Sequence, residues 1–165
     1  MATRYKILLG FGLLLAVAVI VAALNAGEES QGPSASNQVY QSKDYGFSLE
    51  YPADLNTSEF YDNPDGDIIV FQNGSTGFQI FITSYDGGLI TRDTILKDLP
   101  STTVEDPKEV IIGDGIRALI FWSDSPKIGK TREVWFTRDG YLYEVSTYAR
   151  LDTWLANIMK SWKFN

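Results

Sequence analysis

The chain has 165 residues, of which 14 are Lys or Arg and 21 are Asp or Glu, so its formal net charge is −7. It contains neither Cys nor His, which excludes disulfides, a cysteine nucleophile, the usual Cys/His zinc sites and a Ser-His-Asp triad. The acidic balance argues against nucleic acid as a partner, because phosphates are bound by clustered Lys and Arg. The length predicts one ordinary domain, and the 44% hydrophobic content is enough for a core.

Near its start, the chain carries a long apolar run. Residues 7–24, from Ile7 to Leu24, contain no charged or strongly polar side chain. As a helix, this run is about 27 Å long, close to the hydrocarbon thickness of a bilayer. Because Arg4 and Lys6 precede it, the positive-inside rule places residues 1–6 in the cytoplasm and the rest of the chain outside. The sequence therefore predicts a single-pass anchor in the cytoplasmic membrane.

A cleaved signal peptide is the competing interpretation of this run. Such a peptide has an apolar stretch of only about 7–15 residues and small residues before its cleavage site. The two possible sites, after Ala26 and after Ala23, have the bulky Leu24 and Val21 at the −3 position. An uncleaved anchor is therefore favoured, and the absence of Cys excludes a lipoprotein anchor.

The next segment, residues 25–42, is dominated by small and polar residue types. It shows no periodic apolar pattern and cannot bury enough surface to offset the entropy of ordering it. The sequence predicts a flexible tether here, followed by a globular domain at residues 43–165.

Apolar residues in this domain alternate with polar ones, as in the strands of a sheet. Two dipeptides, Asp114-Gly115 and Asp139-Gly140, are typical of two-residue hairpin turns. The predicted strands lie at residues 47–51, 68–71, 77–85, 110–112, 116–122, 131–138 and 141–148.

The turn at Asp139-Gly140 fixes the register of its hairpin, because a two-residue loop determines which residues face each other. The predicted pairs on one face, which we assign to the core, are Arg138 with Tyr141, Phe136 with Tyr143 and Val134 with Val145.

The second face of this hairpin carries Trp135, Leu142 and Tyr148 beside Glu133 and Glu144. Aromatic anchors surrounded by polar groups are typical of protein interfaces, so this face is the predicted partner surface. A competing interpretation is that a helix of the same domain, at residues 92–99, covers it.

Two helices are predicted. Thr91 is a plausible N-cap for residues 92–99, and Pro100 ends that helix. The second helix closes the domain, with an apolar stripe at spacings of three and four that includes Trp154, Leu155 and Ile158. Antiparallel strands with a C-terminal amphipathic helix indicate an α+β domain.

Short motifs at both ends of the domain resemble a known family. The segment YGFSLEYP, from Tyr45 to Pro52, is similar to the Y-G-F-S-F-x-Y-P start of PsbP-like domains. The tail MKSWKF, from Met159 to Phe164, resembles the I-x-x-S-F-x-F end of the same group. The resemblance implies an αβα sandwich around a central, mostly antiparallel sheet, of the membrane-anchored prokaryotic type.

The functions of PsbP-like proteins vary, so the resemblance implies a class of role and no particular residues. Plant PsbP assists the oxygen-evolving side of photosystem II, and one relative is a Ran-binding nuclear import factor. Metal sites in PsbP-type proteins use His, which this chain lacks. No cofactor is expected.

Carboxylates offer two further hypotheses. Asp62, Asp65 and Asp67 form an acidic loop that could supply oxygen ligands to Ca²⁺, although the spacing does not match an EF-hand. The alternative is an ordinary solvated turn, which is more frequent. Glu133 and Glu144 could in principle act as a hydrolase's acid/base pair, but two acids on neighbouring strands are common.

We expect a membrane-tethered extracytoplasmic module without catalytic residues, which interacts with another envelope protein. The first alternative is an extracytoplasmic ligand- or Ca²⁺-binding domain that uses the acidic loop, and the second is a carboxylate-dependent hydrolase. Carboxylates that converge in a concave, partly apolar pocket would favour the alternatives.

Overall fold

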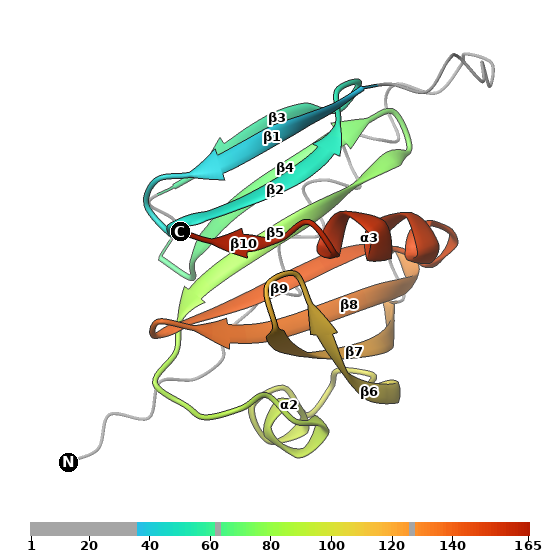
Figure 1. The fold of residues 1–165 in the computed structure, drawn as a ribbon. Coiled ribbons are helices and arrows are strands. Elements are labelled where there is room, and N and C mark those ends of the chain that lie inside the picture. Colours follow the sequence, from blue (N-terminus) through green and yellow to red (C-terminus); the bar gives the residue numbers. More distant parts are fainter. Residues whose placement is uncertain (1–35, 62–63, 126–127) are drawn as a thin grey trace.

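The computed structural model describes residues 36–61, 64–125 and 128–165 (Figure 1). The predicted anchor at residues 7–24 and the predicted tether up to residue 35 lie outside these residues. No helix in the described ranges is both long and apolar enough to span a bilayer. The described part forms a sheet-rich α+β fold with few helices.

Seven antiparallel strands form the main sheet, in the order β3-β4-β5-β9-β8-β7-β6. Hairpin connections and short loops join most sequence neighbours, so strands that follow each other along the chain also lie beside each other. The strands are β3 (Asn56–Phe60), β4 (Asp67–Asn73), β5 (Thr76–Ser84), β6 (Glu105–Ile112), β7 (Ile116–Ser125), β8 (Gly129–Arg138) and β9 (Tyr141–Tyr148).

A second, three-stranded sheet brings the two ends of the described domain together. Its order is β1-β2-β10, and both neighbouring pairs are antiparallel. The strands are β1 (Asn37–Ser42), β2 (Phe47–Pro52) and β10 (Lys163–Phe164). The first strands of the domain therefore pair with residues close to its C-terminal end.

Two α-helices and one short 3₁₀ helix complete the described elements. Helix α2 (Arg92–Asp98) begins at Thr91, whose side chain accepts a hydrogen bond from the backbone N–H of Thr94. The 3₁₀ helix η1 (Ala149–Leu151) leads into α3 (Asp152–Met159). Both predicted helices are thus confirmed.

The hairpin register derived from Asp139-Gly140 is also confirmed. Arg138 lies opposite Tyr141, Phe136 opposite Tyr143, and Val134 opposite Val145. The face assigned to the core is indeed buried, since the side chains of Phe136, Tyr143, Val134 and Val145 are at most 3% exposed.

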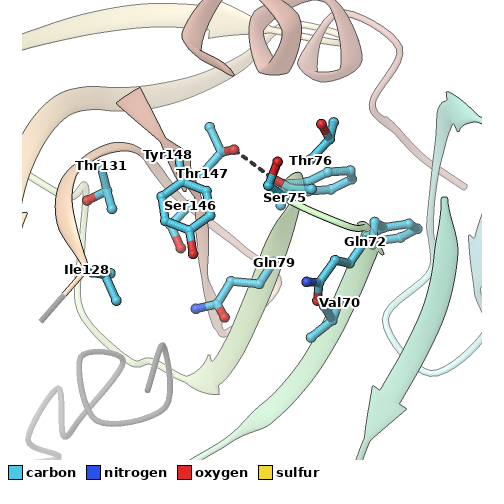
Figure 2. A pocket seen from close by; sticks show the side chains of 13 residues that line it. Val70, Gln72, Ser75, Thr76, Gln79, Ile128, Thr131, Ser146, Thr147 and Tyr148 are labelled. Atoms are coloured by element: carbon cyan, nitrogen blue, oxygen red, sulfur yellow. Dashed lines mark hydrogen bonds between the residues drawn. The ribbon is translucent and has the colours of Figure 1, made fainter. Parts of the chain in front are cut away.

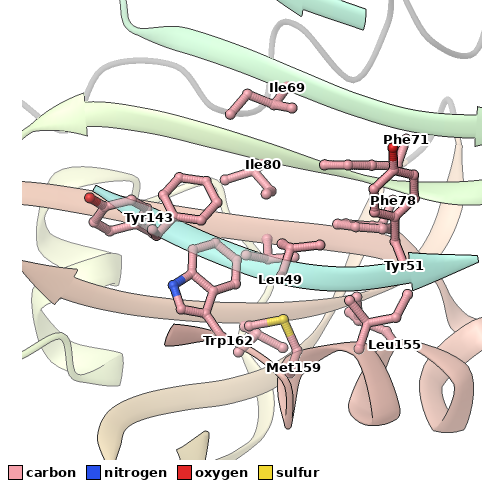
Figure 3. Packing of buried hydrophobic residues seen from close by; sticks show 14 of the residues in the cluster. Leu49, Tyr51, Ile69, Phe71, Phe78, Ile80, Tyr143, Leu155, Met159 and Trp162 are labelled. Carbon is pink, nitrogen blue, oxygen red and sulfur yellow. The ribbon is translucent and has the colours of Figure 1, made fainter. Parts of the chain in front are cut away.

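The main hydrophobic core lies between this first face of the large sheet, the small sheet and α3 (Figure 3). Phe47 of β2 stacks on Trp162 with ring centroids 4.4 Å apart. From α3, Leu155 and Met159 enter the same cluster. Trp154 is only half-buried, so the predicted burial of the helix stripe holds for Leu155 and Ile158 but not in full for Trp154. The layer over this face is therefore a small sheet plus one helix.

An ion pair fixes the start of α3 to the large sheet. Arg132 of β8 donates hydrogen bonds from Nε and Nη2 to the two carboxylate oxygens of Asp152, at 2.7 and 3.1 Å. Its guanidinium also lies over the ring of Trp122, 3.3 Å from the centroid. Paired in this bidentate way, Arg132 can be buried without an uncompensated charge.

The described domain begins earlier than the predicted boundary at residue 43. Residues 37–42 are the edge strand β1, not part of a flexible tether. Only Tyr40 and Ser42 of this strand are buried, and its other four side chains are exposed. The two large apolar residues of this edge strand, Val39 and Tyr40, are adjacent and so give no alternating pattern, which explains the error. Strand β3, also at an edge and mostly exposed, gives no such pattern either.

Candidate functional site

The structure contradicts the predicted partner surface on the second face of the β8–β9 hairpin. Trp135 is 1% exposed and Leu142 is fully buried, while Tyr148 is half-buried. Ile95 of α2, and Ile90 just before that helix, pack against Trp135 and Leu142 in one hydrophobic cluster. The competing interpretation is therefore correct, and this face is part of the core.

Glu133 and Glu144, which were expected at the rim of that surface, are buried as well. They are 3% and 5% exposed. Glu133 accepts hydrogen bonds from Thr131 Oγ1 at 2.6 Å and from Trp135 Nε1 at 3.2 Å. Burial raises the pKa of Glu133 to about 7, although these two hydrogen bonds act in the opposite direction.

Glu144 is in a less favourable environment. Its Oε1 atom has no hydrogen-bond partner among the described residues. Burial, and then the nearby charge of Glu133, raise the pKa of Glu144 well above its usual range. We infer that Glu144 is protonated at neutral pH, because an unpaired buried carboxylate is too costly to ionise.

A pocket opens on the same second face of the large sheet (Figure 2). Its cavity volume is about 30 Å³, room for one or two water molecules. Its walls come from the β4–β5 hairpin, the start of β8 and the end of β9. The lining residues are Val70, Phe71, Gln72, Ser75, Thr76, Gly77, Phe78, Gln79, Ile128, Thr131, Ser146, Thr147 and Tyr148.

Four of these polar side chains are at least nine-tenths buried, namely Gln79, Thr131, Ser146 and Thr147. The strand register explains their position. Gln79 lies opposite Ser146, and Ser146 lies opposite Glu133, so the row crosses β5, β9 and β8 on one face. In Figure 2 the Gln79 side chain extends below Ser146 and Tyr148. Its Oε1 atom has no partner among the described residues.

The rim of the pocket is held in place by contacts to the β4–β5 turn. Thr147 Oγ1 donates a hydrogen bond to the carbonyl of Gly77 at 2.6 Å (Figure 2). The guanidinium of Arg150 donates to the carbonyl of Ser75. The turn is thus tied to the end of β9 and to η1, which gives the pocket a fixed wall.

The pocket differs from what the carboxylate hypotheses require. Its lining contains no Asp, Glu, Lys or Arg among the described residues. Thr131 separates it from Glu133, because the Thr131 side chain lines the pocket and its hydroxyl donates to the Glu133 carboxylate. The two glutamates therefore lie beside the pocket and not in its wall, where a hydrolase would need them.

One residue of the predicted acidic loop, Asp67, has a structural role. Asp62 lies outside the described residues, and Asp67 accepts a hydrogen bond from the Tyr45 hydroxyl at 2.5 Å. In the ranges that the structure describes, no three metal-binding side chains gather at one place. These observations give no support to a Ca²⁺ site at this loop.

Sequence reasoning missed the polar residues of the pocket. Gln79 stands in the segment GFQIFIT, where it is the only residue with a long polar side chain in an apolar strand. That position, on the same face as Phe81, is the signal that could have identified it.

No known protein family matches this sequence, and neither does any curated protein. Solved structures are similar to it in fold. The solution structure of cyanobacterial PsbP (CyanoP) from Synechocystis sp. PCC 6803 is 15% identical, with a TM-score of 0.54 over 84% of this chain and 98% of that one. A crystal structure from Bacteroides thetaiotaomicron VPI-5482 is 17% identical, with a TM-score of 0.48 over 81% of this chain and 49% of that one. The strand order, the closing helix and the similarity to CyanoP together give this chain a PsbP-like fold.

Proposed function

We propose that this protein is a membrane-tethered, extracytoplasmic accessory module that works by binding another molecule and not by catalysis. One observation carries the proposal. The pocket between the β4–β5 hairpin and the ends of β8 and β9 is concave and partly apolar, and its described lining holds no charged side chain. Such a lining can bind a ligand, but it offers no acid, base or cation for bond-breaking chemistry.

Two further facts support this role. The PsbP-like fold favours it, because the sequence resemblance implies an accessory role for PsbP-like domains. The carboxylates that a hydrolase would use, Glu133 and Glu144, are buried beside the pocket. The contact surface proposed here replaces the one expected around Trp135.

The binding role is tested with the full chain in mild detergent, isolated from its own membrane fraction together with the proteins that bind it. A Thr76→Lys substitution puts a charge at the pocket rim, and Gln38→Lys on the exposed edge strand β1 is the matched control. We expect an envelope protein to be captured by the wild type and by the control, but not by Thr76→Lys. Equal capture by all three variants would refute the pocket as the contact site.

The topology is tested separately, by adding protease to spheroplasts. The charge distribution around residues 7–24 supports a domain outside the cytoplasmic membrane. We therefore expect the protease to degrade the domain while a cytoplasmic control protein survives. A domain that stays intact while a known periplasmic protein is degraded would show that this topology is wrong.

A further inference from the structure

The strand β6 forms an open edge of the main sheet (Figure 1). It pairs with β7 on one side, and no other described strand pairs with its second side. Most of its side chains are exposed. Ile111 is 66% exposed, although isoleucine is among the residue types that are most often buried. An open edge with a large exposed apolar side chain can pair with a strand of another chain.

Only the first half of this edge is protected against such pairing. The register against β7 shifts between Glu105 and Lys108, and Asp106 has a φ of +48°. Pro107 has no backbone N–H to donate. Bulges and prolines of this kind hinder edge-to-edge association. Residues 108–112 pair regularly with β7 and contain no proline, so this second half of the edge can accept another strand.

The exposed side chains at this half of the edge suit a second copy of the same chain. Arg117 lies opposite Ile111 in the β6–β7 ladder, and its Nε atom is 4.0 Å from Glu109 Oε2. Leu89 is 54% exposed and lines a small pocket together with the same two charged residues. A surface that carries apolar side chains and charges of both signs can be self-complementary, as a two-fold symmetric interface requires.

One antiparallel register fits a second copy best. In a symmetric pair of identical strands, the central residue lies opposite its own copy. A centre at Lys108 or Glu109 would place like charges directly opposite each other, which is destabilising. A centre at Ile111 or beyond would bring Gly113 into the ladder, although its N–H already donates a hydrogen bond within the chain. The register that remains is centred on Val110.

This register places opposite charges on either side of an apolar residue. Val110 faces its own copy, and Glu109 of each copy faces Ile111 of the other. Because Arg117 is the other neighbour of Ile111, that Arg117 and the Glu109 of the second copy flank the same apolar side chain and attract each other. We propose that this protein forms a symmetric dimer in which residues 108–112 of β6 pair antiparallel with β6 of a second copy. The proposal does not rest on the pocket, which β6 does not line.

Cross-linking tests the register. The chain contains no Cys, so a single introduced Cys reports on one position. Val110→Cys should give a disulfide-linked dimer in native membranes under mild oxidation, because directly opposite Cβ atoms lie about 4.5–5.5 Å apart, close to disulfide geometry. Gln38→Cys, on the exposed edge strand β1, is the matched control and should stay monomeric. Failure of Val110→Cys to cross-link, or equal cross-linking of both variants, would overturn the proposal.

Charge variants test the contact itself, by sedimentation of the full chain in mild detergent. Ile111→Glu places like charges opposite each other at two symmetry-related positions, so it should weaken dimerisation at least about tenfold. Adding Glu109→Lys puts opposite charges at both positions and should restore the dimer. Val39→Glu changes an equally exposed apolar residue on β1 and should leave dimerisation unchanged. A dimer that Ile111→Glu does not weaken would overturn the proposal.

A measurement on the wild type covers the case in which a variant does not fold. The wild-type chain should sediment as a dimer whose population rises with protein concentration. A chain that stays monomeric up to its solubility limit would overturn the proposal, and so would an envelope protein that a monomeric chain captures through Ile111. The outcome is separable from that of the capture experiment, because Thr76→Lys should dimerise as the wild type does whether or not it captures a partner.

Discussion

At the residue scale, the main feature is the pair of buried glutamates on the second face of the sheet. The hairpin register, worked out from the sequence, placed Glu133 and Glu144 correctly as neighbours on that face. It did not show that the face is buried, because α2, which covers Trp135, comes from a distant segment of the chain. Local register can be predicted from a turn, but burial depends on what packs against the strands.

These buried carboxylates predict that the stability of the protein depends on pH. Burial raises the pKa of Glu133 to about 7 and that of Glu144 further above its usual range. The folded protein therefore holds these protons more tightly than the unfolded chain, in which the pKa of Glu133 is 4.5. The free energy of unfolding should fall as the pH rises from about 4.5 to about 7, by about 3 kcal/mol for Glu133 alone.

Urea unfolding at the two ends of this pH range measures the effect. The double variant Glu133→Gln, Glu144→Gln should show a flatter dependence on pH than the wild type. Glu105→Gln, Glu109→Gln on the exposed strand β6 is the matched control and should keep the wild-type slope. Identical slopes in all three proteins would show that the buried pair does not titrate in this range.

At the scale of elements, strands with strong apolar alternation and the two helices could be predicted from the sequence. Strands β1 and β3 could not, because both lie at sheet edges and expose most of their side chains. The pocket could not be predicted for a related reason. Its walls come from β5, β8 and β9, and the order of these strands in the sheet is a property of the whole fold.

The closing helix gives a prediction at this scale. Leu155 is fully buried between α3 and the large sheet, so Leu155→Ala leaves a cavity and should cost about 2–5 kcal/mol. Thr153 is exposed on the same helix, and Thr153→Ala should change stability by less than about 0.5 kcal/mol. The urea midpoints of the two variants test this, and a Leu155→Ala midpoint equal to that of Thr153→Ala would mean that the helix is not docked.

At the scale of the whole molecule, the C-terminal residues connect parts that are distant in sequence. The turn between β6 and β7 lies against the segment that follows α3, since Gly113 N–H donates to the Met159 carbonyl and Asp114 N–H to the Trp162 carbonyl. Gly113 has a φ of +44°, and a Cβ at this position would overlap the Trp162 carbonyl oxygen. This position therefore requires glycine for two reasons, backbone conformation and space.

Gly113→Ala should consequently destabilise the protein by about 3–5 kcal/mol, from left-handed backbone strain and overpacking together. Gly115, in the same turn, has a φ of +88° but open space around it. Gly115→Ala should cost only about 1 kcal/mol, from the backbone strain. Thermal unfolding of both variants separates the backbone strain from the overpacking. Equal losses of stability in the two variants would contradict the close approach of the turn to Trp162.

The pairing of β10 with β2 has a consequence for biosynthesis. Residues 163–164 follow every other described strand along the chain, so β2 stands without this partner, and the core without Trp162, until these residues have been synthesised. A nascent chain therefore cannot complete this domain until residue 164 has emerged, however early the first strands emerge. Contacts between residues so far apart in the sequence slow the folding of a domain, so the last steps in folding of this domain follow the synthesis of β10.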